Sequence, residues 1–120
     1  MTTQELKTRT FQFGSRVITA VEALPRTQTA QILGRQLLRA GTSGGANYRG
    51  AARARSRADF VAKLGIVEEE CDEASYWLEM ILERKLLKRG QLDNLLAEAD
   101  ELISITVASI KTARRNRQCR

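Results

Sequence analysis

Apolar residues recur every three or four positions along most of the chain, which is the spacing of amphipathic α-helices. The pattern predicts four helices, at residues 4–24, 26–54, 57–88 and 91–114. It is most regular in the third helix, whose inward positions are Phe60, Leu64, Val67, Cys71, Ala74, Leu78 and Ile81. Such a repeat is typical of the seam of a left-handed helical bundle. Because the connections are short, we expect an all-α, antiparallel, up-down-up-down four-helix bundle.

Few residues interrupt this pattern, and each interruption indicates a helix boundary. Pro25 cannot continue a helix but can begin one, so the first helix is expected to end before it. Ser56 followed by Asp59 is typical of a capping box at the start of the third helix. Glycine commonly follows the last residue of a helix, so Arg89 and Gly90 are expected just beyond the end of the third helix.

The glycine-rich segment 41–45 would ordinarily indicate a loop. On a continuous helix, however, Gly41 and Gly44 fall on the same face as Leu37 and Tyr48. Small residues at a helix crossing let two backbones approach closely, which can outweigh the cost of about 1 kcal/mol for an interior glycine. We therefore predict that the second helix runs unbroken through this segment.

The third helix carries a second apolar face, roughly opposite its core seam. This aromatic face consists of Ala62, Ile66, Tyr76, Trp77 and Met80, with Glu69 and Glu73 among them. A monomeric bundle buries one stripe of each helix, so the aromatic face would be left in water. Exposed aromatic residues are common at protein–protein contacts, which predicts an oligomer interface. The alternative is that the third helix is central and packed on two sides.

Composition narrows the chemistry that the chain can perform. The 120 residues, treated as a single domain 1–120, contain no histidine and two cysteines. The commonest general base and metal ligand is therefore missing, and two cysteines cannot build a zinc cluster or a disulfide framework. The acidic run Glu68–Glu70 could suggest a di-metal bundle, but those sites need Glu-x-x-His pairs. We expect no catalytic residues, no metal, no cofactor and no enzyme activity.

Hydropathy indicates a cytoplasmic protein without a membrane partner. No apolar run approaches the roughly 18 residues of a membrane span, and the polar N-terminus lacks the apolar core of a secretory signal. Both cysteines are then expected to be reduced. Cys71 fits a core position, whereas Cys119 is expected to be an exposed thiol in the C-terminal tail.

The net charge of +6 is distributed unevenly. Residues 1–58 carry a net charge of +8, residues 59–83 carry −7, and the basic tail at residues 111–120 carries +5. On a continuous second helix, an arginine stripe lies opposite the core face and consists of Arg35, Arg39, Arg49 and Arg53. The tail adds Lys111, Arg114, Arg115 and Arg117. These eight residues are the candidate nucleic-acid-binding residues.

Three interpretations of the arginine stripe stay open. It is a solvated face, or it pairs with acidic residues of the third helix in a neighbouring copy, or it binds RNA or DNA backbone. Nothing indicates sequence-specific binding, because the chain has no groove-reading motif and no cluster of base-stacking aromatic residues. The alternative function is an adaptor or scaffold whose charged faces serve subunit assembly or an acidic protein partner.

The second and third helices also resemble a known family. The stretch Gly34–Arg49 (GRQLLRAGTSGGANYR), with Ala51–Ser56 and Asp59–Ile66 after it, is similar to the four-helix-bundle proteins encoded in 23S rRNA intervening sequences. The match continues through Tyr76-Trp77-Leu78-Glu79 and covers the chain from about Phe11 to Lys111. Two residues depart from the family pattern: Gly44 replaces a β-branched residue, and Gly50 replaces a glutamate.

This resemblance implies more about fold and assembly than about function. It implies an up-down-up-down bundle that assembles into a ring-like homopentamer. It also implies a distant relationship to the accessory proteins of diversity-generating retroelements, which bind nucleic acid and a reverse transcriptase through a basic surface. It implies no catalytic activity. Asn47 and Tyr48 belong to the family signature, and we expect them to serve packing and a buried polar contact.

Overall fold

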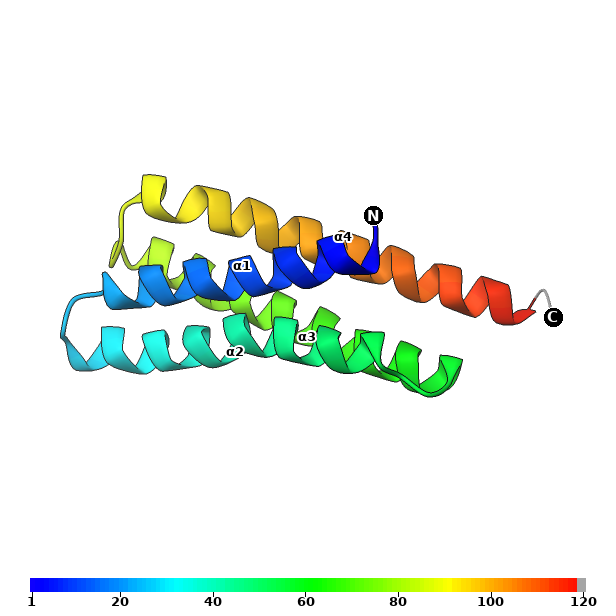
Figure 1. Ribbon diagram of the computed structural model, residues 1–120. Coiled ribbons are helices and arrows are strands. Elements are labelled where there is room, and N and C mark those ends of the chain that lie inside the picture. The colour runs from blue at the N-terminus through cyan, green and yellow to red at the C-terminus, as the bar shows by residue number, and fades with distance from the viewer. Residues whose placement is uncertain (119–120) are drawn as a thin grey trace.

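Four helices pack side by side, and consecutive helices run in opposite directions (Figure 1). The computed structural model describes residues 1–118, with side chains as far as Asn116. Its helices are α1 (Thr3–Glu22), α2 (Gln28–Ala52), α3 (Arg57–Glu83) and α4 (Arg89–Gln118), and the described part has no strand. Each helix packs on the next, and α1 also touches α4. The all-α, four-helix prediction is confirmed, in a rod of 54 × 20 × 20 Å.

Hydroxyl side chains begin three of the four helices. The side chains of Thr2, Thr27 and Ser56 each accept a hydrogen bond from the backbone N–H three residues further on, at 3.0 to 3.2 Å. Only Thr2 has the full capping box, because its own N–H donates to Glu5 at 2.9 Å. At Ser56 half of the predicted box forms, since the Asp59 carboxylate pairs with a lysine one turn later.

The end of α3 differs from the prediction. Gly90 was expected beyond the third helix, but α3 ends earlier, at Glu83, and Gly90 lies in the first turn of α4. Lys85 closes α3 in the left-handed conformation, with φ of 56°. Leu86 then donates its N–H to the carbonyl oxygen of Ile81 at 3.1 Å, as in a Schellman motif. The helix stops here because Leu86 and the leucine after it turn back onto the core.

The second helix continues through residues 41–45, as predicted. Here α1 and α2 cross so closely that a Cβ on Gly41 would lie 2.7 Å from a methyl carbon of Val17. Gly14 of α1 contributes from the other side, since its Cβ would lie 3.3 Å from the carbonyl oxygen of Gly41. The glycines are therefore needed for the approach of the two backbones.

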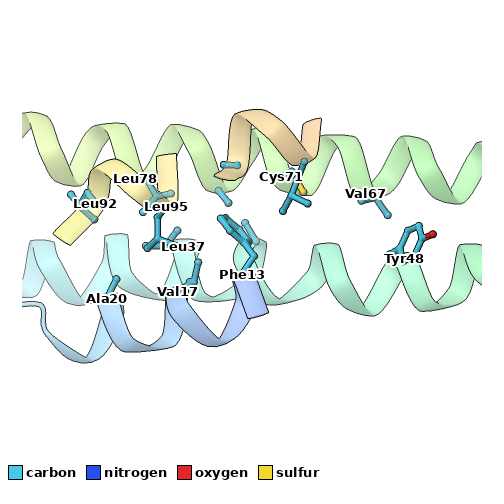
Figure 2. Close-up of a cluster of buried hydrophobic side chains, with 14 of the residues drawn as sticks. Phe13, Val17, Ala20, Leu37, Tyr48, Val67, Cys71, Leu78, Leu92 and Leu95 are labelled. Atoms are coloured by element: carbon cyan, nitrogen blue, oxygen red, sulfur yellow. The ribbon is translucent and has the colours of Figure 1, made fainter. Parts of the chain in front are cut away.

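The core runs along the bundle axis and receives side chains from all four helices. Figure 2 shows Phe13 and Val17 of α1 converging with Leu37 of α2 and Leu78 of α3. Among the largest fully buried side chains are Leu37, Leu64, Leu78, Ile81, Leu92 and Leu102. Two threonines are also buried, and their hydroxyls donate to carbonyl oxygens one turn earlier at 2.9 and 2.7 Å. Within the described residues no buried polar side-chain atom lacks a partner.

Candidate nucleic-acid interface and assembly face

The four arginines of the predicted stripe are all exposed, three of them on α2 and Arg53 directly after its last residue, but their neighbours differ. Arg39 forms ion pairs within the same chain, with Glu73 at 2.6 Å and Glu70 at 3.4 Å. The hydrogen bond between Arg39 and Glu73 is the main reason why the pKa of Arg39 is raised and the pKa of Glu73 is lowered. Arg39 is thus partly neutralised by α3. Arg35, Arg49 and Arg53 form no ion pair with a described residue.

A groove of about 630 Å³ lies between the outer sides of α1 and α2. Its larger side chains are Phe11, Ile18, Arg49 and Arg53. Phe11 is 63% exposed, and the guanidinium carbon of Arg49 lies 5.7 Å from the centre of its ring, within cation–π range. Sequence reasoning missed this groove, because the helical period alone does not show which exposed residues of two helices meet.

The connection from α2 to α3 and the last turns of α4 lie toward the same end of the bundle (Figure 1), and both segments carry basic residues. We call this the basic end; it consists of Arg55, Arg57, Lys111, Arg114 and Arg115. Arg55 and Arg57 line a groove of about 810 Å³ together with the start of α1 and the last turns of α4. A smaller hollow of about 250 Å³ lies between Arg57 and Arg114.

The basic end carries uncompensated charge, because none of its five side chains forms an ion pair with a described acidic residue. The structure therefore brings together three of the predicted tail residues with Arg55 and Arg57, which were not selected as site residues. A fourth predicted residue, Arg117, has its side chain outside the described part, and Cys119 also lies outside it.

The aromatic face of α3 is exposed at its centre. Ile66 is 42% exposed and Tyr76 is 52% exposed, while Ala62 and Glu69 are also at the surface. In the described structure no other helix covers these side chains. The predicted second apolar face therefore exists, although the structure of one chain does not test what it contacts.

Trp77 corrects the prediction that the whole face lies in water. Its side chain is half-buried against the core, and the side chain of Met80 is also half-buried. The indole N–H of Trp77 donates to Glu73 at 3.4 Å. The ring of Tyr76 meets the indole edge-on, with the ring centres 4.9 Å apart. Trp77 thus connects the aromatic face to the carboxylate that pairs with Arg39.

The remaining chemistry of the described residues is sparse. No group of three or more histidine, cysteine or acidic residues among them could hold a metal ion. Burial raises the pKa of the Cys71 thiol to about 12, helped by the charges of Glu70 and Glu98, so the reactive thiolate is scarce at neutral pH. None of the described helices is both long and apolar enough to span a membrane.

Comparisons with known proteins agree with this architecture. A crystal structure from Bacteroides thetaiotaomicron, described as a protein of unknown function from the S23 ribosomal protein family, is 33% identical and superposes with a TM-score of 0.85. The match covers 92% of this chain and 99% of the Bacteroides chain. Among curated proteins, none matches. The family model of the 23S rRNA-intervening sequence proteins matches residues 3–108, so the chain belongs to that family, as its sequence indicated.

Proposed function

We propose that the protein is a non-catalytic, homo-oligomeric bundle that binds the backbone of RNA or DNA through its basic end. The observation that supports this function is the meeting of Arg55, Arg57 and the last turns of α4 around one groove. These cations have no described acidic partner, so phosphates can replace their counterions and gain free energy from counterion release. The planar guanidinium also suits the geometry of phosphate oxygens.

In this proposal only part of the arginine stripe binds nucleic acid. Arg39 is already paired with Glu70 and Glu73, so we assign it to the structure of the bundle. Arg49 and Arg53 remain available beside the basic end, and Arg35 remains exposed further along α2. Binding is then concentrated at one end of the rod and does not extend evenly along α2.

Salt-dependent binding tests the nucleic-acid proposal. A triple neutralisation at the basic end, Arg55→Gln with Arg114→Gln and Arg115→Gln, is compared with a matched triple at the opposite end, Arg26→Gln with Arg84→Gln and Lys88→Gln. All six side chains are exposed, and both triples remove the same charge. Fluorescence anisotropy with a labelled single-stranded RNA and an RNA hairpin is measured over a series of salt concentrations.

We expect the first triple to lose most of the affinity and the second to retain it. For single strands, removing three phosphate contacts is expected to reduce the salt slope by about 2. Equal losses in the two triples would show that binding follows net charge alone and would contradict a site at the basic end. If the wild-type protein shows no salt-sensitive binding even at low ionic strength, the nucleic-acid function is wrong and the adaptor alternative is favoured.

We further propose that copies of the chain assemble into a ring-like homopentamer through the aromatic face. The support is the resemblance to the family together with the exposed Ile66 and Tyr76, which a monomer leaves in water. Light scattering on Ile66→Glu tests this, because a carboxylate at the centre of an apolar contact should reduce the mass to that of a monomer. Ala97→Glu, at an exposed position of α4, is the control and should keep the wild-type mass. A monomeric wild type would refute the assembly.

We also propose a cytoplasmic location, as expected from the sequence. The buried free thiol of Cys71 suits a reducing compartment. Fractionation of cells that produce the tagged protein should recover it with the cytosolic fraction, and recovery in an exported fraction would contradict the proposal.

A further inference from the structure

The groove between α1 and α2 has a floor of small residues. It forms where the two backbones nearly touch, since a Cβ on Gly45 would lie 3.1 Å from the carbonyl oxygen of Thr10. Gly14, Ser15, Thr42 and Ala46 also line it. Its volume of about 630 Å³ lies within the range of small-molecule sites. A flat group can therefore lie against this floor without displacing large side chains.

Phe11 is the one aromatic residue that lines this groove, and its ring is more accessible than expected for a phenylalanine. Phe11 is 63% exposed, although the guanidinium carbon of Arg49 lies 5.7 Å from the centre of its ring. The cation–π contact orients the ring and leaves much of it in water. An exposed aromatic ring held in this way is a surface on which another flat, apolar group can stack.

The charged groups of the groove all have one sign. Arg49 and Arg53 line it, and both also line an adjoining hollow of about 410 Å³ together with Lys7. No acidic residue lines either space, and none of the three cations has an ion pair with a described residue. The groove thus combines one stacking surface with three neighbouring sites for negative charge.

We propose that this groove binds single-stranded nucleic acid, with one base stacked on Phe11 and the neighbouring phosphates on Lys7, Arg49 and Arg53. The inference rests on the proposed nucleic-acid function and adds the strand type. Single strands offer base faces and phosphates together, and stacking on aromatic residues beside a basic groove is how proteins bind them without sequence preference. A duplex hides its base faces, so it can use the cations but not the ring.

A second copy of the chain is the competing occupant, because the aromatic face of α3 is both apolar and acidic. Of the two acids within that face, Glu69 has no ion pair with a described residue. Glu73, however, is already paired with Arg39 in its own chain, as is the neighbouring Glu70. That pairing leaves less negative charge to satisfy the three cations of the groove. Charge therefore favours nucleic acid as the occupant. A second copy as the occupant would be recognised by a lower oligomeric mass in the groove variants.

The test compares a labelled 20-nucleotide single strand of mixed sequence with the duplex of the same sequence, by fluorescence anisotropy at one low salt concentration. The variants are Phe11→Leu, which keeps an apolar side chain, and Phe11→Tyr, which keeps the ring. Because Phe11 is mostly exposed, both variants should fold, and circular dichroism confirms this. Ile32→Leu, at an exposed position of α2 outside the groove, is the control for a conservative change of an exposed apolar side chain.

We expect Phe11→Leu to weaken single-strand binding by about 5- to 100-fold, the loss of one base–aromatic stack. Duplex binding should stay within about 2-fold, and Phe11→Tyr and Ile32→Leu should bind both forms like wild type. If Phe11→Leu binds the single strand like wild type, or weakens both forms equally, the stacking site is wrong while the function of the basic end stands. A fall in oligomeric mass in Phe11→Leu would assign the groove to a second copy. Absence of binding to either form at this low salt concentration would refute both proposals.

Discussion

Replacing Gly41 by alanine tests the close crossing of α1 and α2. The added Cβ would lie 2.7 and 2.8 Å from the two methyl carbons of Val17 and 3.0 Å from its Cβ. Val17 is completely buried, and its β-branched side chain has few accessible rotamers. A rotamer change cannot move the Val17 Cβ in any case. The backbones of α1 and α2 must therefore separate to admit a single methyl group.

Two opposing effects determine the size of the change. Overpacking a core by one methyl group costs about 1–3 kcal/mol, whereas replacing an interior helical glycine by alanine gains about 1 kcal/mol. We expect Gly41→Ala to lower the free energy of unfolding by about 1 kcal/mol. Gly65→Ala is the matched control, because no atom lies within 4 Å of its added Cβ. That variant should be about 1 kcal/mol more stable than wild type.

Urea unfolding followed by circular dichroism gives both values. The protomer concentration must be equal in all samples, since assembly makes apparent stability depend on it. The difference of about 2 kcal/mol between the two variants isolates the packing effect from helix propensity. In the background of Val17→Ala, the penalty at Gly41 should largely disappear, because the clashing methyl groups are gone. Equal stabilities of Gly41→Ala and Gly65→Ala would refute the close crossing.

Three further predictions concern single residues. Lys85→Gly should stabilise the fold by about 0.5–1 kcal/mol in urea unfolding, because the left-handed conformation strains lysine but not glycine; a loss of stability would contradict this reading of the α3 end. In a Cys119→Ser variant, Cys71 should react with a thiol reagent at pH 8 only as fast as the fold opens, because burial raises the pKa of its thiol to about 12; immediate reaction would show that the site is accessible. Titration by NMR should give Glu73 a pKa below that of an ordinary glutamate, and Arg39→Gln should raise it; an unchanged value would exclude the ion pair in solution. Because the folded pKa of Glu73 is lowered, its stabilising effect is present above the unfolded value of about 4.3 and is lost as pH falls through the folded value.

Helical periodicity was sufficient to predict the four helices and the continuity of α2. Gly41 and Gly44 lie on the same buried face of the helix as Leu37 and Tyr48. This regular spacing predicts a helix even though glycine itself has a low helix propensity. The end of α3 was not predictable in the same way. Its left-handed residue is Lys85, which carries none of the usual signals, and the helix stops because the following leucines can reach the core.

The site was less predictable than the fold because it depends on contacts between helices. Periodicity placed Arg39 on the exposed side of α2, but only the register of α2 against α3 brings it to Glu73. In the same way, Arg57 and Arg114 are distant in sequence and meet only because the helices are antiparallel. The sequence around Phe11 does not indicate a binding role, since the contact with Arg49 joins two different helices.

The separation of charge along the rod also affects how the protein encounters other molecules. At physiological ionic strength electrostatic fields decay over about 8 Å. Arg57 at the basic end and Glu68, where the acidic run of α3 begins, are about 16 Å apart along the helix, at 1.5 Å per residue. Asp59 lies closer but pairs with Lys63. The acidic run therefore does little to screen the field of the basic end. A polyanion diffusing nearby is expected to be steered to one tip of the 54 Å rod, with an association rate that falls steeply as salt is added.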